Sequence, residues 1–249
     1  MAEEMARGGA VPLVTVLVAV LVALLFSGCA TGPGPVRVSA ATTPAEAGLV
    51  DMRVLVPDIA QDIRYAGADN FVGVPVDGYE APRCYLLRPV AEALRRVELD
   101  LRGRDLRLQL FDCYRPTRAV AHFMRWAADP DDQRTRPDYY PNLDKGDLLG
   151  GYIAPVSGHS RGATLDLTLM RCAAGDAGCQ ALDMGTGFDF FDARAHTDST
   201  LVTPPQRANR QLLRAAMQRH GFRNYPYEWW HYTFTPEPSP GLAFDVPIR

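Results

Sequence analysis

The sequence predicts an α+β fold, a single domain with a mostly antiparallel central sheet and flanking helices. Two observations lead to this prediction. Apolar and polar residues alternate over residues 106–113 and 163–169, as expected for strands. Helical periodicity is confined to separate blocks, of which residues 87–101 are the clearest. Because helices and strands do not alternate strictly, an antiparallel sheet is favoured over one wound from βαβ units.

A candidate export signal lies near the start of the chain. Residues 12–26 form an apolar run interrupted only by Thr15, which is short for a membrane-spanning helix and typical of a signal-peptide core. Ser27-Gly28-Cys29 follows and resembles a bacterial lipoprotein cleavage box, so Cys29 is expected to carry the lipid. An ordinary signal peptide or an uncleaved anchor is the alternative. We therefore expect an exported, periplasmic protein with a signal peptide over residues 1–28, which contacts the membrane only through Cys29.

The remaining residues divide into a tether and one domain. Residues 29–48 are rich in Gly, Pro, Ala and Thr without an apolar period, which predicts a flexible tether. The segment of residues 49–249 is long enough to form a single domain with a sizeable buried core. The net charge of -3, with both signs interspersed, provides no basic stripe of the kind that nucleic-acid binding requires. The sequence leaves the oligomeric state open.

The first half of this domain contains a helix, a strand and a second helix. Residues 87–101 are expected to be an amphipathic helix, with Pro89 in its first turn and Gly103 after its end. The strand of residues 106–113 leads into a turn at Tyr114-Arg115-Pro116. Thr117 is then expected to cap the next helix.

Residues 129–150 contain many Pro, Asp and Tyr residues and no periodicity, so they are expected to form a long loop of the kind that often serves as a lid. Thr203, followed by two prolines and Gln206, is the pattern of a capping box at the start of a helix. That helix is expected to run to about His220 and to stop at Gly221.

Four cysteines follow Cys29. An oxidising compartment and an even count favour disulfides. Cys172 and Cys179 lie in one Gly/Ala-rich loop and are the preferred pair. Cys84 and Cys113 are the remaining pair, although Cys113 is also compatible with a buried thiol.

Four residues together have the side chains that a catalytic zinc site requires. His159, Asp166 and His231 would supply two imidazoles and one carboxylate, which leaves the fourth tetrahedral position open. Glu228 would then be the general base. Each residue alone is compatible with a structural role, but the combination favours a metal site.

The spacing of Glu228 and His231 requires an irregular backbone. Residues 227–234 are aromatic-rich and strand-like, yet residues three apart in a regular strand point to opposite faces. A bulge or turn near Trp229 would bring both side chains to one site.

Several motifs together resemble the zinc D-alanyl-D-alanine dipeptidases of the type known from vancomycin resistance. The resemblance extends over residues 62–234 and implies the fold shared with zinc D-alanyl-D-alanine carboxypeptidases and the hedgehog signalling domain. It also implies one zinc ion per chain and a small dipeptide substrate. The matching motifs are Ser157-x-His159-Ser-Arg-Gly-x-x-x-Asp166, Asp112-Cys-Tyr-Arg115-Pro116, Met184-Gly-x-x-Phe-Asp189 and Glu228-Trp-Trp-His231.

The resemblance also implies roles for residues outside the metal site. Arg115, always charged and with a rigid donor fork, is expected to stabilise the oxyanion, as the corresponding arginine does in the family. Asp189 corresponds to the carboxylate that binds the free ammonium of the dipeptide, with Tyr65 close by. Ser157 corresponds to a hydroxyl that contacts the substrate.

The sequence therefore predicts a zinc dipeptidase that hydrolyses D-Ala-D-Ala. One alternative is a D,D- or L,D-carboxypeptidase that acts on longer peptidoglycan peptides. A second alternative, from a different class, is a non-catalytic lipoprotein that binds the cell wall and contains a structural zinc.

Overall fold

The computed structural model describes residues 36–173 and 178–249. The expected signal peptide, the lipid attachment site Cys29 and the first part of the expected tether lie outside the described residues. Within those two ranges, no helix has both the length and the apolar character needed to cross a bilayer.

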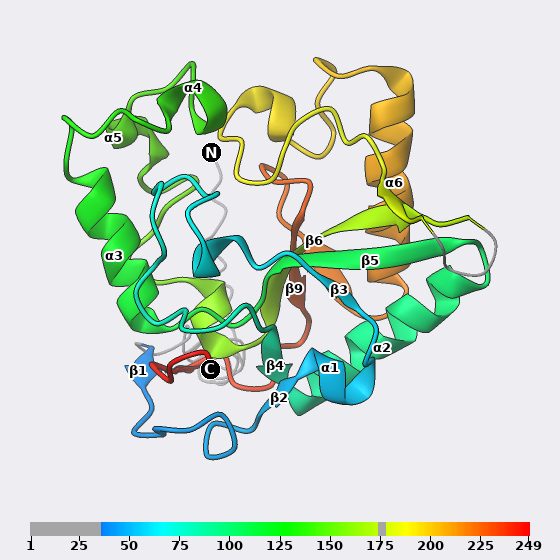
Figure 1. The fold of residues 1–249 in the computed structure, drawn as a ribbon, viewed down its shortest axis with the longest axis horizontal. Coiled ribbons are helices and arrows are strands. Elements are labelled where there is room, and N and C mark those ends of the chain that lie inside the picture. Colours follow the sequence, from blue (N-terminus) through cyan, green and yellow to red (C-terminus); the bar gives the residue numbers. More distant parts are fainter. Residues whose placement is uncertain (1–35, 174–177) are drawn as a thin grey trace, which may run out of the picture. The chain divides into compact units, whose positions relative to one another are not determined.

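Short strands and helices alternate irregularly along the described residues (Figure 1). The strands are β1 (Arg37–Val38), β2 (Leu49–Asp51), β3 (Ala60–Gln61), β4 (Tyr85–Leu87), β5 (Leu106–Asp112), β6 (Thr164–Arg171), β7 (Gln180–Ala181), β8 (Phe222–Asn224), β9 (His231–Phe234) and β10 (Leu242–Ala243). The α-helices are α1 (Met52–Leu55), α2 (Arg88–Arg102), α3 (Thr117–Ala127), α4 (Arg136–Tyr139), α5 (Lys145–Leu148) and α6 (Pro204–Gln218), and the 3-10 helices are η1 (Arg64–Ala66), η2 (Gly158–Arg161) and η3 (Ala193–Ala195).

The central sheet has the strand order β3-β5-β6-β9-β8, and β7 pairs with β6 beyond this path. Among the described strands of this sheet, β3 pairs with β5 in parallel, whereas β5, β6, β7, β9 and β8 pair in antiparallel fashion. The predicted α+β fold with a mostly antiparallel sheet is therefore confirmed.

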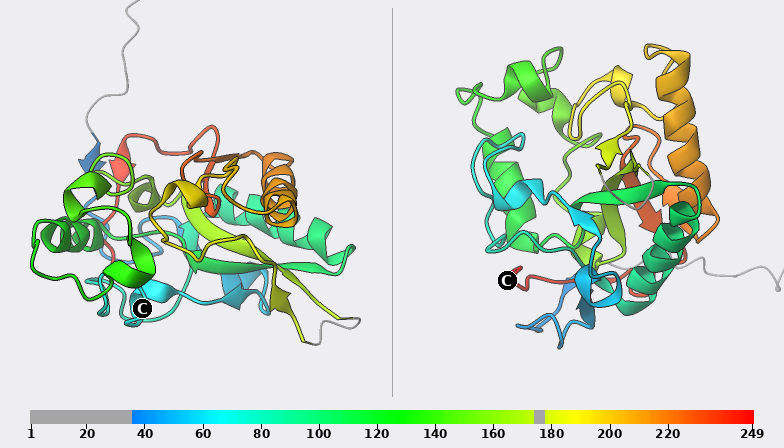
Figure 2. Two further views of the ribbon diagram at one scale, coloured as in Figure 1. Left: turned by 90° about the horizontal axis from the view of Figure 1, so that it is seen from above. Right: turned by 45° about the vertical axis from the view of Figure 1, so that its right-hand side comes forward.

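Helices α2 and α6 contact each other and pack against the sheet, α2 on β5 and α6 on β8 and β6 (Figure 2). The apolar stripe of α2 explains this packing, because Val90, Leu94, Val97 and Leu101 are all fully buried. Helices α3, α4 and α5 lie away from this pair, on the left of Figure 1. The sheet therefore has a well-packed helical side, while the first residues of β6 and β9 and the segment after β5 are left to line a cavity.

Several predicted elements are confirmed within one or two residues. Helix α2 begins at Arg88 with Pro89 in its first turn, and it ends before Gly103. Helix α6 begins with the expected capping box, in which the Thr203 side chain accepts from the backbone of Gln206 and the Gln206 side chain accepts from the backbone of Thr203. These elements form where local capping and the apolar period agree.

Three local predictions are wrong. Thr117 is not a cap: Pro116 takes that position with an extended backbone, and Thr117 is the first residue of α3. Residues 129–150 are not a structureless loop, because α4 and α5 lie within them. The expected tether is too long at its C-terminal end, since β1 pairs with β10 and Ala47 is buried in the core.

The four cysteines of the domain form two disulfides, Cys84–Cys113 and Cys172–Cys179. The second is the preferred pair from the sequence. The first joins the residue before β4 to the residue after β5, and both cysteines are buried. This disulfide therefore lies at the end of β5 that leads into the cavity.

Candidate metal centre and active site

Three adjacent strands bring the candidate metal ligands together. Asp166 is the third residue of β6, where it lies opposite His231 at the start of β9 and opposite Asp112 at the end of β5. Residues directly opposite on neighbouring strands project to the same face of a sheet. Strand pairing thus places two acids and one imidazole side by side.

The third candidate ligand, His159, is supplied by the turn before β6. Ser157 caps η2 by accepting a hydrogen bond from the backbone N–H of His159. Two glycines make the tight path possible. A Cβ on Gly158 would lie 2.7 Å from Oγ1 of Thr164, and Gly162 has a φ of 69°. The turn therefore brings the side chain of His159 beside that of Asp166 in β6.

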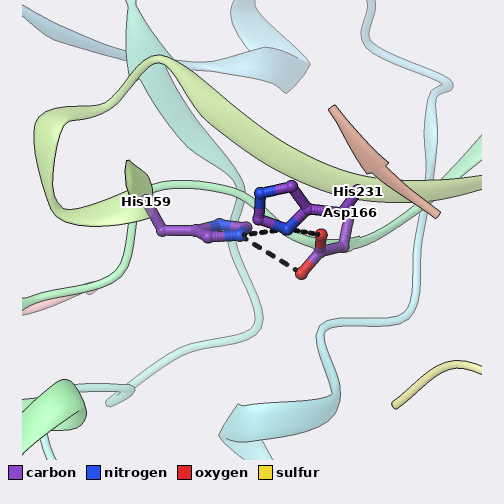
Figure 3. Close-up of side chains that lie close together, drawn as sticks. All are labelled: His159, Asp166 and His231. Carbon is purple, nitrogen blue, oxygen red and sulfur yellow. Dashed lines mark hydrogen bonds and ion pairs between the residues drawn. The ribbon is translucent and has the colours of Figure 1, made fainter. Parts of the chain in front are cut away.

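The ligand atoms of these three residues face one another (Figure 3). Nε2 of His159 lies 3.3 Å from Nδ1 of His231 and 3.4 Å from Oδ2 of Asp166, and Nδ1 of His231 lies 3.0 Å from Oδ1 of Asp166. Two ligands at about 2.0–2.1 Å from one tetrahedral ion would be roughly 3.3–3.4 Å apart. The donor set and its spacing therefore fit a zinc ion.

The protonation of His159 also suits a ligand. Its Nδ1 lies 2.7 Å from the carbonyl oxygen of Cys113, which can only accept, so Nδ1 carries the hydrogen. Burial lowers the pKa of His159, which favours the neutral ring and leaves a free lone pair on Nε2. Orienting hydrogen bonds of this kind are usual for histidines that bind metals.

The carboxylate of Asp166 is held in its charged form. Burial alone would raise its pKa, but the neighbouring His159 and His231 outweigh burial and hold the pKa well below its usual range. Oδ1 of Asp166 is buried and has no hydrogen-bond partner of good geometry. A buried carboxylate oxygen that lacks a hydrogen-bond donor favours a cation bound at this position.

Glu228 reaches the same site because the chain turns before β9. Residues 226–230 form turns, and regular pairing begins only at His231. The irregular backbone expected near Trp229 is therefore present. Oε2 of Glu228 lies 3.3 Å from Nδ1 of His231. Burial, reinforced by the charge of Asp166, raises the pKa of Glu228 well above its usual value.

Arg115 is anchored beside the ligands by Asp112. Its Nε and Nη2 lie 3.0 Å and 2.8 Å from Oδ2 of Asp112, and Nη2 lies 3.7 Å from Oδ2 of Asp166. The guanidinium carbon lies 5.1 Å from the ring centre of Tyr65 and 4.9 Å from that of Phe123. The sequence did not identify Asp112 as a functional residue, although its position three residues before Arg115 at the end of a strand was a usable signal.

Asp189 forms a second acidic position in the cavity. Its Oδ2 accepts a hydrogen bond of 2.7 Å from the Tyr65 hydroxyl, a neutral donor. Burial raises the pKa of Asp189 well above its usual value, and the nearby charge of Asp166 adds to the effect. Asp189 also has a φ of 56°, which is unfavourable for a residue with a Cβ and is most often kept at functional sites.

All of these side chains except Asp112 line one cavity of about 270 Å³. The cavity brings together every residue for which the sequence predicted a catalytic, metal-binding or substrate-binding role: Tyr65, Arg115, Ser157, His159, Asp166, Asp189, Glu228 and His231. Residues 150–154, which follow α5, line it as well. Tyr152 in this segment was not identified from the sequence.

The chain is similar to known dipeptidases over most of its length. Residues 45–248 match a family model described as D-ala-D-ala dipeptidase. A D-alanyl-D-alanine dipeptidase of Enterococcus faecium is 40% identical over 205 residues, which cover 82% of this chain and 100% of that protein. One from Streptomyces coelicolor is 44% identical over 78% of this chain and 95% of its own length, and one from Escherichia coli is 36% identical over 79% and 90%.

Proposed function

The chain belongs to the D-Ala-D-Ala dipeptidase family of zinc metallopeptidases, and from this premise we propose that it hydrolyses D-Ala-D-Ala to two D-alanines with one zinc ion per chain. One observation carries the proposal: three ligand atoms converge at 3.0–3.4 Å from one another in a cavity that also contains Glu228 and Arg115.

His159, Asp166 and His231 would hold the zinc ion, which supplies a Lewis acid for the scissile carbonyl and lowers the pKa of water. Glu228 is the general base. It takes one proton from the attacking water, whose oxygen adds to the carbonyl carbon, and it delivers that proton to the leaving amine as the C–N bond breaks. Its raised pKa supports this role, because the carboxyl group can keep the proton between the two steps.

Arg115 would stabilise the negative charge that develops on the carbonyl oxygen. Its guanidinium is held by Asp112 and lies beside two aromatic rings, so it does not need to reorganise when that charge appears. Burial alone would lower the pKa of Arg115, but the negative charge of Asp112 contributes to a net rise, so the side chain stays charged.

Asp189 and Tyr65 would bind the free ammonium group of the dipeptide. A buried carboxylate with a neutral phenol as its partner gains a full counter-charge when an ammonium enters. An N-acylated peptide offers no such charge and leaves the carboxylate unpaired. This difference supports a dipeptidase over a carboxypeptidase that acts on longer peptides.

The test is a comparison of substrates on the purified protein of known metal content. We expect about one zinc per chain, turnover of D-Ala-D-Ala, and much slower turnover of its N-acetyl derivative. Preference for the acetylated compound would favour the carboxypeptidase, and zero turnover with zinc bound would favour a wall-binding protein.

We also propose that the protein is exported, with Cys29 as the lipid attachment site. The apolar run of residues 12–26 and the two disulfides of the domain support this, since disulfides persist in oxidising compartments. Metabolic labelling with a fatty acid tests it: wild type should be labelled, and a Cys29→Ser variant should not.

A further inference from the structure

The turn between β8 and β9 determines how the candidate base lies relative to a candidate ligand. Glu228 and His231 belong to this one turn. Its backbone hydrogen bonds run from Tyr225 N–H to the His231 carbonyl (2.9 Å), from Glu228 N–H to the Tyr225 carbonyl (3.1 Å) and from His231 N–H to the Glu228 carbonyl (3.3 Å). We propose that Asn224, the last residue of β8, is a positioning residue that holds Glu228 and His231 in their mutual arrangement. The inference rests on the proposed function for its catalytic meaning.

The carboxamide of Asn224 joins the two ends of the turn. Its Nδ2 lies 2.9 Å from the carbonyl oxygen of Glu228 and 3.0 Å from that of His231. Both partners can only accept, so the atom that faces them must be the amide nitrogen with its two hydrogens. One side chain therefore binds the backbone of the base and the backbone of the ligand at once.

The other end of the carboxamide is also anchored. Oδ1 of Asn224 accepts a hydrogen bond of 2.6 Å from the hydroxyl of Thr197, which is buried. The backbone N–H of Thr197 donates to the carbonyl of Pro226 within the same turn. Thr197 thus fixes the rotation of the Asn224 side chain, so the two donors stay directed at the two carbonyls.

No other common side chain reproduces this set of contacts. An aspartate has the same shape, but it would place a second acceptor oxygen against two carbonyl oxygens. The expected result is a displaced turn, in which Glu228 and His231 no longer converge on the cavity. Asn224→Asp therefore removes the two donors with almost no change in volume.

The experiment compares Asn224→Asp with Asn209→Asp. Asn209 lies on α6 and donates to a single carbonyl, that of Asp183, so it controls for the added charge and for the loss of one amide donor. We expect Asn224→Asp to lose zinc to a competing chelator and to lower kcat per bound zinc, each by roughly 10–100-fold, with KM for D-Ala-D-Ala little changed. Asn209→Asp should stay within about twofold of wild type in each measurement. Wild-type zinc retention and kcat in a folded Asn224→Asp protein would overturn the proposal.

A second readout separates this inference from the proposed function. Amide hydrogen exchange over residues 225–231 reports on the turn itself, whether or not the protein is catalytic. Faster exchange in Asn224→Asp but not in Asn209→Asp, with an inactive wild type, would reject the dipeptidase and retain the positioning role. Unchanged exchange would reject the positioning role.

If Asn224→Asp does not fold, Thr197→Val decides the question. This variant removes only the hydroxyl that orients Asn224. We expect faster exchange in the turn and weaker zinc retention, and Thr197→Ser should restore both. A Thr197→Val protein with wild-type exchange and zinc retention would contradict the proposal.

Discussion

Nδ1 of His159 donates a hydrogen bond to the carbonyl oxygen of Cys113, and the two atoms are 2.7 Å apart. Cys113 is also disulfide-bonded to Cys84, which precedes β4. The residue that orients a candidate metal ligand is therefore covalently tied to the residue that precedes β4. This arrangement connects the disulfide to the geometry of the site as well as to the stability of the fold.

Replacement of Cys84 and Cys113 by serine should therefore affect both stability and metal binding. The disulfide spans 29 residues, for which loop-closure entropy gives about 3–4 kcal/mol of unfolding free energy. The Cys172–Cys179 disulfide spans 7 residues, should contribute about 2 kcal/mol, and follows the C-terminal end of β6, whereas Asp166 is near the start of that strand. Denaturant titration and zinc competition on the two double-serine variants should show weaker zinc binding for the first only. Equal zinc affinity in both would contradict the link.

Glu228→Gln should separate metal binding from catalysis. The amide has the same shape as the carboxylate but cannot accept the proton of water, so kcat should fall by about 10²–10⁴-fold. Zinc content should stay at the wild-type level, because Glu228 is not one of the three converging ligands. Metal analysis and steady-state kinetics on the same sample measure both. Full activity in this variant would reject Glu228 as the base.

Arg115→Lys should reduce kcat although it keeps the charge. A lysine cannot bind Asp112 through two nitrogens as Arg115 does, so we expect a loss of about 10²–10³-fold in kcat. Arg118→Lys is the matched control, since Arg118 makes a similar two-nitrogen contact with Asp245 on the surface. Its kcat should be close to that of wild type. Comparable losses in the two variants would indicate a general effect of the substitution.

Asp189→Asn should weaken recognition of the substrate ammonium. KM for D-Ala-D-Ala should rise, and discrimination against the N-acetyl dipeptide should shrink, because the amide has no charge to leave unpaired. Tyr65→Phe, which removes only the donor to Asp189, should cause a smaller change in the same direction. Ratios of kcat/KM for the free and acetylated dipeptides provide the measurement. Unchanged ratios in Asp189→Asn would exclude it from ammonium binding.

Asp192 should contribute stability that is lost in acid. Burial alone would raise its pKa, but hydrogen bonds from Arg194 and Asn142 hold the pKa at about 2. Because the folded pKa lies below the unfolded value, the contribution is complete above about pH 4 and disappears as the pH falls toward 2. At neutral pH it should be about 1–2 kcal/mol, since the partly exposed Arg194 is screened by water. The difference in unfolding free energy between wild type and Asp192→Asn should therefore narrow between pH 4 and pH 2, and a constant difference would contradict the assignment.

Several elements of the fold could be predicted from short-range pattern because their causes are local. The apolar stripe and Pro89 were sufficient to define α2, the capping box at Thr203 was sufficient to define the start of α6, and alternation defined β5 and β6. Local pattern failed where a tertiary contact decided the outcome. Residues 37–38 look like part of a linker, and they become β1 because β10 lies beside them.

The residue types of the candidate site were also apparent in the sequence, because only a few side chains can bind zinc or act as a base near it. Their arrangement was not. Asp112, Asp166 and His231 lie opposite one another only through the register of three strands, and Asn224 reaches Glu228 only because the chain turns between β8 and β9. Register and turn closure depend on contacts between residues far apart in sequence, which no local pattern encodes. The chain therefore specifies its chemistry through residue identity, whereas the distances that this chemistry requires are decided by tertiary packing.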